Sequence, residues 1–68
     1  MNQIIQRYMT LIRQDVVKDP TVVHSTHDVA DTLEYLSRDD DEVTEDNYDQ
    51  ILTPVIDQLI NEDLIYRD

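Results

Sequence analysis

Two stretches of the chain carry residue types that could do chemistry. Seven of the eleven residues from position 39 to position 49 are carboxylates, and no lysine or arginine lies among them. Carboxylates bind Ca²⁺ and Mg²⁺, and a dense group of them attracts basic proteins. The shorter stretch His24-Ser25-Thr26-His27-Asp28 combines imidazoles, hydroxyls and a carboxylate, as zinc sites and hydroxyl nucleophiles do. Each of these chemistries requires a particular spacing.

The acidic stretch does not have the spacing of a calcium-binding EF-hand loop. Such a loop needs a glycine at its sixth position and a glutamate at its twelfth. Counting from Asp39 places Thr44 sixth and Gln50 twelfth, and counting from residue 41 fails in the same way. We therefore expect no EF-hand and no dedicated metal site here.

The histidine stretch is better explained as the start of a helix. Zinc would need a further well-placed ligand beside His24 and His27, and the chain has no cysteine. A nucleophile needs a base and an oxyanion hole in a formed cleft, for which a glycine-free chain of 68 residues has little material. Ser25, however, can cap a helix, with Asp28 returning the hydrogen bond. We expect no catalytic residue, no metal ion, no cofactor and no enzymatic activity.

The charge of the chain is large and unevenly distributed. Sixteen acidic and five basic residues give a net charge of −11. Residues 1–18 carry +2, so residues 19–68 carry −13. This field repels nucleic acid and anionic membranes and attracts basic proteins. We expect a protein that binds neither nucleic acid nor membrane directly, and the absence of cysteine and of an export signal fits the cytoplasm.

The length predicts one small domain, residues 1–68, of marginal stability. A chain of this size buries only roughly 60% of its unfolded surface, and repulsion among the acids lowers stability further at low salt. Homodimerisation would relieve both problems and stays open. Arg7 and Arg13 are expected to lie in solvent, or to pair with the acidic surface of a second copy.

Helical periodicity predicts an all-α, three-helix domain. The first helix covers residues 2–18 and ends at Asp19-Pro20, the second follows Ser25 and ends near Arg38, and the third begins at Thr44 and is kinked or split at Pro54. Residues 21–24 and 64–67 leave room for a minor two-strand pairing. The apolar stripes expected to form the core are Ile4, Ile5, Tyr8, Met9, Leu11, Ile12 and Val16; Val29, Ala30, Leu33 and Leu36; and Tyr48, Ile51, Leu52, Val55, Ile56, Leu59 and Ile60. Because the chain has no glycine, any turn with positive φ must use asparagine or aspartate.

The predicted helices arrange the acids in rows. Asp46, Asp49, Thr53 and Asp57 lie on the side of the third helix opposite its apolar stripe, with Glu45 and Asp46 in its first turn. Asp28, Asp31 and Glu34 make a second row on the middle helix. Carboxylates three or four residues apart on a helix stand roughly 5–6 Å apart, as phosphates do along a nucleic-acid strand. Residues 39–42 are expected to form a solvated acidic loop. The candidate partner-binding residues are Asp28, Asp31, Glu34, Tyr35, Asp39, Asp40, Asp41, Glu42, Glu45, Asp46, Asp49 and Asp57.

The order of the elements resembles a winged helix-turn-helix cut off before its wing. In that fold the third helix reads DNA, whereas here its outward side carries Asp46, Asp49 and Asp57 and would be repelled by phosphates. The hypothesis that follows is a DNA mimic: a small acidic protein, typical of phages and mobile elements, that inhibits a nucleic-acid-binding protein by occupying its basic cleft. The alternative is a helical dimerisation or adaptor module with an ordinary solvated acidic surface.

Overall fold

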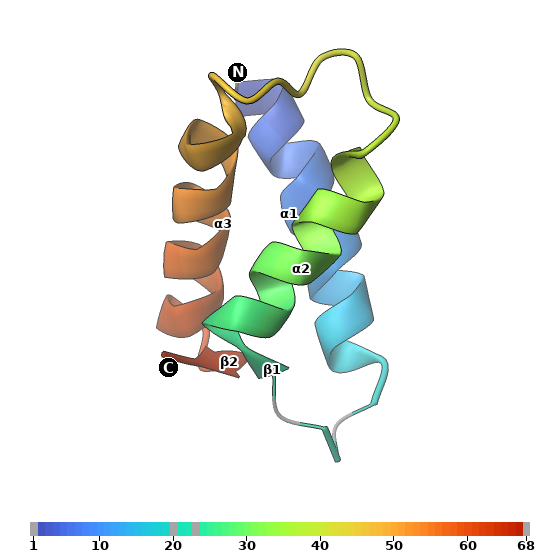
Figure 1. Ribbon diagram of the computed structural model, residues 1–68. Coiled ribbons are helices and arrows are strands. Elements are labelled where there is room, and N and C mark those ends of the chain that lie inside the picture. Colours follow the sequence, from blue (N-terminus) through green and yellow to red (C-terminus); the bar gives the residue numbers. More distant parts are fainter. Residues whose placement is uncertain (1, 20, 23, 68) are drawn as a thin grey trace.

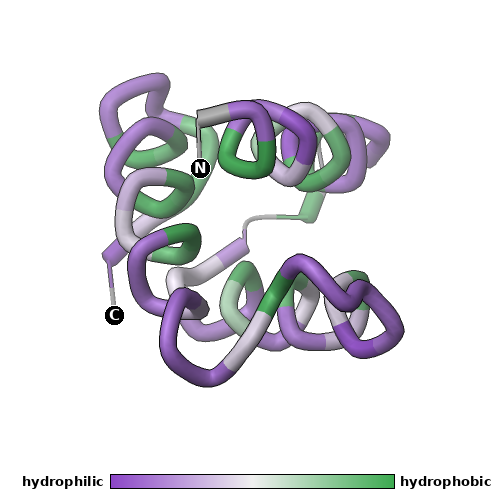
Figure 2. Tube along the Cα trace, turned by 90° about the horizontal axis from the view of Figure 1, so that it is seen from above, coloured by the Kyte–Doolittle hydropathy of each residue, from purple (hydrophilic) through white to green (hydrophobic). Residues whose placement is uncertain are grey.

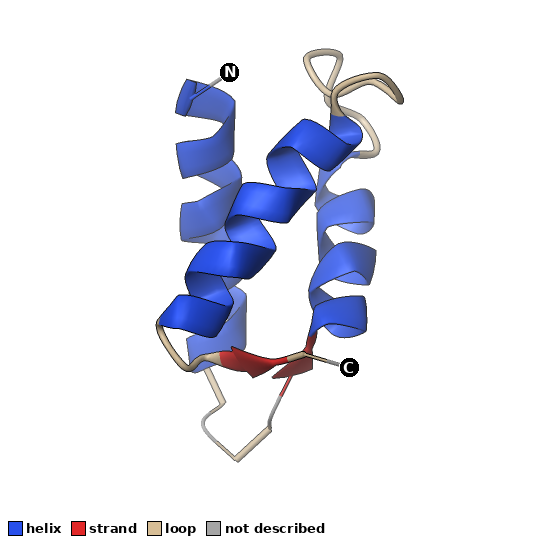
Figure 3. Ribbon diagram, turned by 90° about the vertical axis from the view of Figure 1, so that its left-hand side faces the viewer, coloured by secondary structure: helices blue, strands red, loops and turns tan. Residues whose placement is uncertain are grey.

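The computed structural model describes residues 2–19, 21–22 and 24–67 and has the predicted all-α architecture (Figure 1). The elements in chain order are α1 (Asn2–Val17), β1 (His24–Ser25), α2 (Thr26–Ser37), α3 (Tyr48–Asn61) and β2 (Ile65–Tyr66). Helices α1 and α3 run in the same direction, and α2 runs in the opposite direction and crosses α1 obliquely (Figure 1). In the view of Figure 3, α3 lies in front of α1 and α2. In the described part of the chain, no helix has both the length and the apolar composition that crossing a membrane requires.

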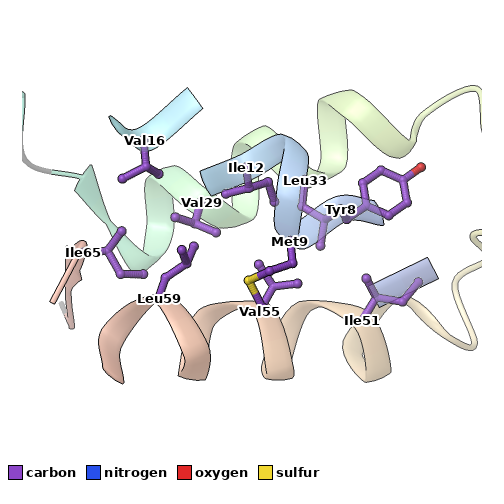
Figure 4. Close-up of a cluster of buried hydrophobic side chains, with 10 residues drawn as sticks. All are labelled: Tyr8, Met9, Ile12, Val16, Val29, Leu33, Ile51, Val55, Leu59 and Ile65. Carbon is purple, nitrogen blue, oxygen red and sulfur yellow. The ribbon is translucent and has the colours of Figure 1, made fainter. Parts of the chain in front are cut away.

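The core lies where the three helices face one another (Figure 4). Its buried members are Tyr8, Met9, Ile12, Val16, Val29, Leu33, Ile51, Val55, Leu59 and Ile65. Viewed from above, the hydrophobic positions turn inward and the hydrophilic positions turn outward (Figure 2). The sequence predicted nine of these ten residues from the helical stripes, and the tenth, Ile65, comes from β2.

Two leucines that were expected in the core are exposed instead. Leu11 is 42% exposed and Leu36 is 38% exposed. The buried row of α2 runs through Val29, Leu33 and Ser37 at intervals of four residues, which leaves Leu36 on the flank of the helix. Ser37 is buried because its hydroxyl donates a hydrogen bond to the Glu34 carbonyl.

The strand pairing is short and parallel. Residues 21–24 were expected to pair with 64–67, and the structure pairs His24 with Ile65 and Ser25 with Tyr66. The pairing therefore exists, with its first strand displaced toward α2. Pro20 and Val23 lie outside the described residues. The Asp19 carboxylate accepts hydrogen bonds from the Thr21 amide and hydroxyl.

The start of α2 follows the capping pattern predicted from the sequence. The Ser25 hydroxyl accepts a hydrogen bond of 3.1 Å from the Asp28 amide, and the Asp28 carboxylate accepts one of 3.2 Å from the Ser25 amide. Two backbone donors that the first turn would leave unpaired are thus satisfied.

Helix α3 begins four residues later than expected. Thr44 and Asn47 form a reciprocal turn, in which each side-chain oxygen accepts a hydrogen bond from the amide of the other residue. The helix proper starts at Tyr48, so Glu45 and Asp46 lie in the turn before it and not in its first turn. Thr44 and Asn47 satisfy each other, and this local bonding competes with regular helix. The helix then continues through Pro54 without splitting.

The end of α3 is a turn built on aspartate. Asp63 has φ of 58°, in the left-handed region that glycine usually occupies. Its amide donates to the Ile60 carbonyl, and the Leu64 amide donates to the Leu59 carbonyl. This is the hydrogen-bonding pattern of a Schellman motif. The expectation that aspartate would take a positive-φ position in this glycine-free chain is confirmed.

Candidate functional site

The cations of α1 are paired with acids of the same chain. Arg13 makes a two-pronged contact with Glu62, with Nε–Oε1 and Nη2–Oε2 distances of 3.0 and 2.7 Å. Arg7 pairs with Asp40, and Lys18 lies 3.3 Å from Asp15. Arg7 is exposed, as expected, and Arg13 is half-buried. Each of them also closes a contact between α1 and a distant part of its own chain, which the sequence did not predict.

Asp40 holds the acidic loop against α1. Its carboxylate accepts hydrogen bonds from the Tyr8 hydroxyl, the Arg7 guanidinium and, at 2.9 Å, the Glu42 amide. The hydrogen bond from Tyr8 is the main reason that the pKa of Asp40 lies below its ordinary value, and the Glu42 amide and the charge of Arg7 act in the same direction. Burial, together with Asp40, raises the pKa of Tyr8. Asp40 is therefore an intramolecular anchor, which corrects the expectation of a wholly solvated loop.

Carboxylates of α2 and α3 converge along the seam between these helices. The partly buried Tyr48 hydroxyl lies in this seam and donates a hydrogen bond of 3.0 Å to the Ala30 carbonyl. Burial raises the pKa of Tyr48, and the charges of Glu34, Asp31 and Asp49 raise it further. Three acids from two helices thus act on one hydroxyl, so the structure brings together members of the two rows that the sequence predicted.

We use the name acidic face for six exposed carboxylates on α2, on α3 and in the turn before α3: Asp31, Glu34, Glu45, Asp46, Asp49 and Asp57. An open groove of about 450 Å³ lies at one end of this face, and its lining includes Glu34, Glu45, Arg38, Val43 and Tyr48. Its two carboxylates and its aromatic ring suit a cationic side chain, whose charge can meet the carboxylates while its aliphatic stem packs on the ring. Arg38 already supplies one positive charge at this groove.

The remaining predicted binding residues lie apart from this face or are already engaged. Asp28 belongs to the cap of α2, although its side chain is exposed. Tyr35 is 68% exposed on another side of α2, where the Arg38 guanidinium lies 5.5 Å from the centre of its ring. The other loop acids, Asp39, Asp41 and Glu42, are exposed.

Two contacts of this region could not be found from sequence patterns. Asp40 lies 33 residues from Arg7, and Glu62 lies 49 residues from Arg13. Only the packing of α1 against the rest of the chain brings these partners together. The one signal was indirect: three of the five basic residues lie in the first eighteen positions and face an acidic remainder.

Within residues 2–19, 21–22 and 24–67, no group of three or more histidine or acidic side chains is arranged to hold a metal ion. In comparisons with known proteins, no family model, no curated protein and no solved structure matches the chain.

Proposed function

We propose that this protein binds a basic, nucleic-acid-binding protein through its acidic face and inhibits it by occupying the surface that nucleic acid would use. The observation that carries the proposal is the groove in which Glu34 of α2 and Glu45 of the turn before α3 lie beside Tyr48. The charges of Asp31 and Asp49 also act on the Tyr48 hydroxyl, and Asp31 and Glu34, three residues apart on α2, have a spacing close to that of phosphates.

The distribution of the cations supports the same proposal. Arg7, Arg13 and Lys18 all lie on α1 and are paired with Asp40, Glu62 and Asp15. These pairs leave the positive charge of α1 neutralised on the chain itself, so it does not weaken the field of the acidic face. Association with a basic cleft would be steered by charge and weakened by salt. Such an inhibitor, of the kind that a phage or mobile element carries, would act in the cytoplasm.

A capture experiment with charge-matched variants tests this proposal. The face variant Asp46→Asn/Asp49→Asn/Asp57→Asn and the control variant Gln3→Lys/Gln6→Lys/Thr10→Lys each change the net charge from −11 to −8, since each replaces three residues at one unit of charge per residue. The control positions are exposed and lie on α1. Each protein is immobilised and incubated with a lysate of the native host, and captured proteins are challenged with duplex DNA and with salt.

We expect the wild type and the control to retain a DNA-binding protein that both duplex DNA and salt displace, and the face variant to lose it by at least about tenfold. Equal capture by the face variant and the wild type would exclude the acidic face. Captured proteins that duplex DNA fails to displace would exclude mimicry of nucleic acid.

A further inference from the structure

The groove beside Tyr48 is built from separate parts of the chain. Its lining comes from α2, from the loop that follows α2 (residues 38–47, the α2–α3 loop) and from the first residue of α3: Glu34, Ser37, Arg38, Val43, Thr44, Glu45 and Tyr48. Glu34 lies on α2, whereas Glu45 lies on the loop. The two carboxylates therefore share one groove only while the loop keeps its place.

The α2–α3 loop has little apolar packing of its own. Its one hydrophobic residue is Val43, which is partly buried against the core. Its backbone hydrogen bonds are local, such as those from the Asp40 amide to the Ser37 carbonyl and from the Val43 amide to the Asp40 carbonyl. A segment with few buried apolar contacts and exposed hydrogen bonds opens at a lower free energy than the core. A contact that ties this loop to a distant element therefore strongly affects where the loop lies.

Asp40 is the residue that ties the loop to α1. Its Oδ2 atom accepts hydrogen bonds from the Tyr8 hydroxyl and the Arg7 guanidinium, while its Oδ1 atom accepts one from the Glu42 amide. One carboxylate thus joins α1 to the backbone of the loop. In the part of the chain that the structure describes, every hydrogen bond between this loop and α1 ends on Asp40. We call the contact among Arg7, Tyr8 and Asp40 the clasp.

We propose that Asp40 is a positioning residue for the groove beside Tyr48. The clasp holds the α2–α3 loop against α1 and so keeps Glu45 in one groove with Glu34. When the clasp is lost, the loop opens while the three helices stay packed. The clasp thereby controls the same groove as the proposed function, on which this inference rests, from residues that lie outside the acidic face.

The packing of the helices does not depend on the clasp. The ring of Tyr8 is buried in the core, but only its hydroxyl takes part in the clasp. Arg13 and Glu62 form a separate link between α1 and the residue that follows α3. Opening of the loop leaves this second link in place, so the two links can be tested apart from each other.

Hydrogen exchange of the free protein, followed by NMR, measures the opening of the loop. The amides of Glu42 and Val43 both donate to Asp40 and report on the loop, and the amide of Leu33, inside α2, reports on the core. In the wild type we expect the loop amides to exchange faster than the core amide, at rates that low denaturant concentrations leave unchanged. Tyr8→Phe removes the hydroxyl without changing the net charge, and it should speed up exchange of the loop amides about tenfold.

Arg13→Met is the matched control for Arg7→Met. Each variant removes one cation and changes the net charge from −11 to −12, and methionine keeps an aliphatic stem but has no donor. Arg7→Met should speed up exchange of the loop amides, as Tyr8→Phe does. Arg13→Met should leave them unchanged, because its link is present with the loop open and with the loop closed. Loop amides that exchange only together with the core amide, or that respond alike to the two arginine variants, would overturn the proposal.

The capture assay tests whether binding depends on the clasp. The double variant Arg7→Met/Tyr8→Phe also has a net charge of −12, which by itself strengthens the attraction to a basic partner. Because only the closed loop offers the intact groove, the double variant should nevertheless capture the DNA-binding protein at least about threefold less than Arg13→Met does. Equal capture by these two variants would overturn the positioning role. If the wild type captures no such protein, the proposed function fails, while the exchange rates still decide whether the clasp holds the loop.

Discussion

At the scale of single residues, Asp40 decides where the acidic loop lies. It takes hydrogen bonds from Tyr8 and Arg7, which are neighbours on α1, and from the amide of Glu42 in its own loop. Tyr8 is at once a core residue, 3% exposed, and a donor to a surface carboxylate. A hydroxyl at the edge of a core needs such a partner, because a buried polar group without one is costly. The loop is thus fastened to the core through one carboxylate.

The stability that Asp40 contributes should depend on pH. Because its pKa is lowered in the folded state, its contribution is fully present above the unfolded value of about 3.9 and is lost as the pH falls through the folded value. Asp40→Asn should therefore be less stable than the wild type at pH 7, and the difference should shrink below about pH 4. Denaturant titrations of both proteins across this range measure the effect. The control Asp39→Asn changes an exposed acid of the same loop, and its free energy of unfolding should equal that of the wild type at every pH. If the difference in free energy of unfolding between Asp40→Asn and the wild type did not change with pH, the charge of Asp40 would not contribute to stability.

At the scale of the elements, the sequence predicted the features that depend on neighbouring residues and missed those that depend on how the helices pack. The stripes around Ile12, Leu33 and Val55 identified three helices, and Ser25 with Asp28 gave the start of α2, because these features depend on neighbours within one or two turns. The exposure of Leu11 and Leu36 depends on the angle at which α2 crosses α1, and no single helix encodes that angle.

The candidate site divides along the same line. The rows of acids on α2 and α3 follow from helical spacing, so Glu34 and Asp49 were correctly expected on exposed surfaces. That both rows meet at Tyr48 is a property of the packed helices. The free orientation assumed for Asp40 was wrong because its partners on α1 lie more than thirty residues away.

The turn after α3 offers a stability prediction at this scale. Asp63 adopts positive φ, and its negative charge lies at the negative end of the helix dipole. Asp63→Gly should raise the free energy of unfolding by about 0.5–1 kcal/mol. Asp63→Ala should lower it, because alanine keeps the Cβ that is unfavourable in the left-handed region and lacks the short polar side chain that lets aspartate adopt this conformation. Thermal and denaturant unfolding of the two variants would measure the difference, and equal stabilities would contradict the assignment of strain to this position.

At the scale of the whole molecule, the acids are concentrated where they do not help the fold. Asp40 and Glu62 hold α1 in place and Asp28 caps α2, but in the described part of the chain the acids of the face make no ion pair with lysine or arginine. Their mutual repulsion opposes folding. A group of exposed acids that lowers stability fits the proposed binding function, since stability is commonly lost where a site is built.

This argument predicts how stability responds to salt. Raising the ionic strength from about 0.01 M to 0.15 M shortens the screening length from about 30 Å to 8 Å, so the free energy of unfolding of the wild type should rise by roughly 1–3 kcal/mol as repulsion is screened. Two variants carry the same, smaller net charge: the face variant Asp46→Asn/Asp49→Asn/Asp57→Asn and the control Gln3→Lys/Gln6→Lys/Thr10→Lys. Their free energies of unfolding should rise less with salt than that of the wild type. We expect the smallest rise in the free energy of unfolding for the face variant, because it removes acidic charges themselves, whereas the control adds cations at other positions, on α1. Denaturant titrations of all three proteins at the two ionic strengths would measure the difference. If the two variants respond alike, the acids act only through net charge, and their arrangement on α2 and α3 contributes nothing to the field.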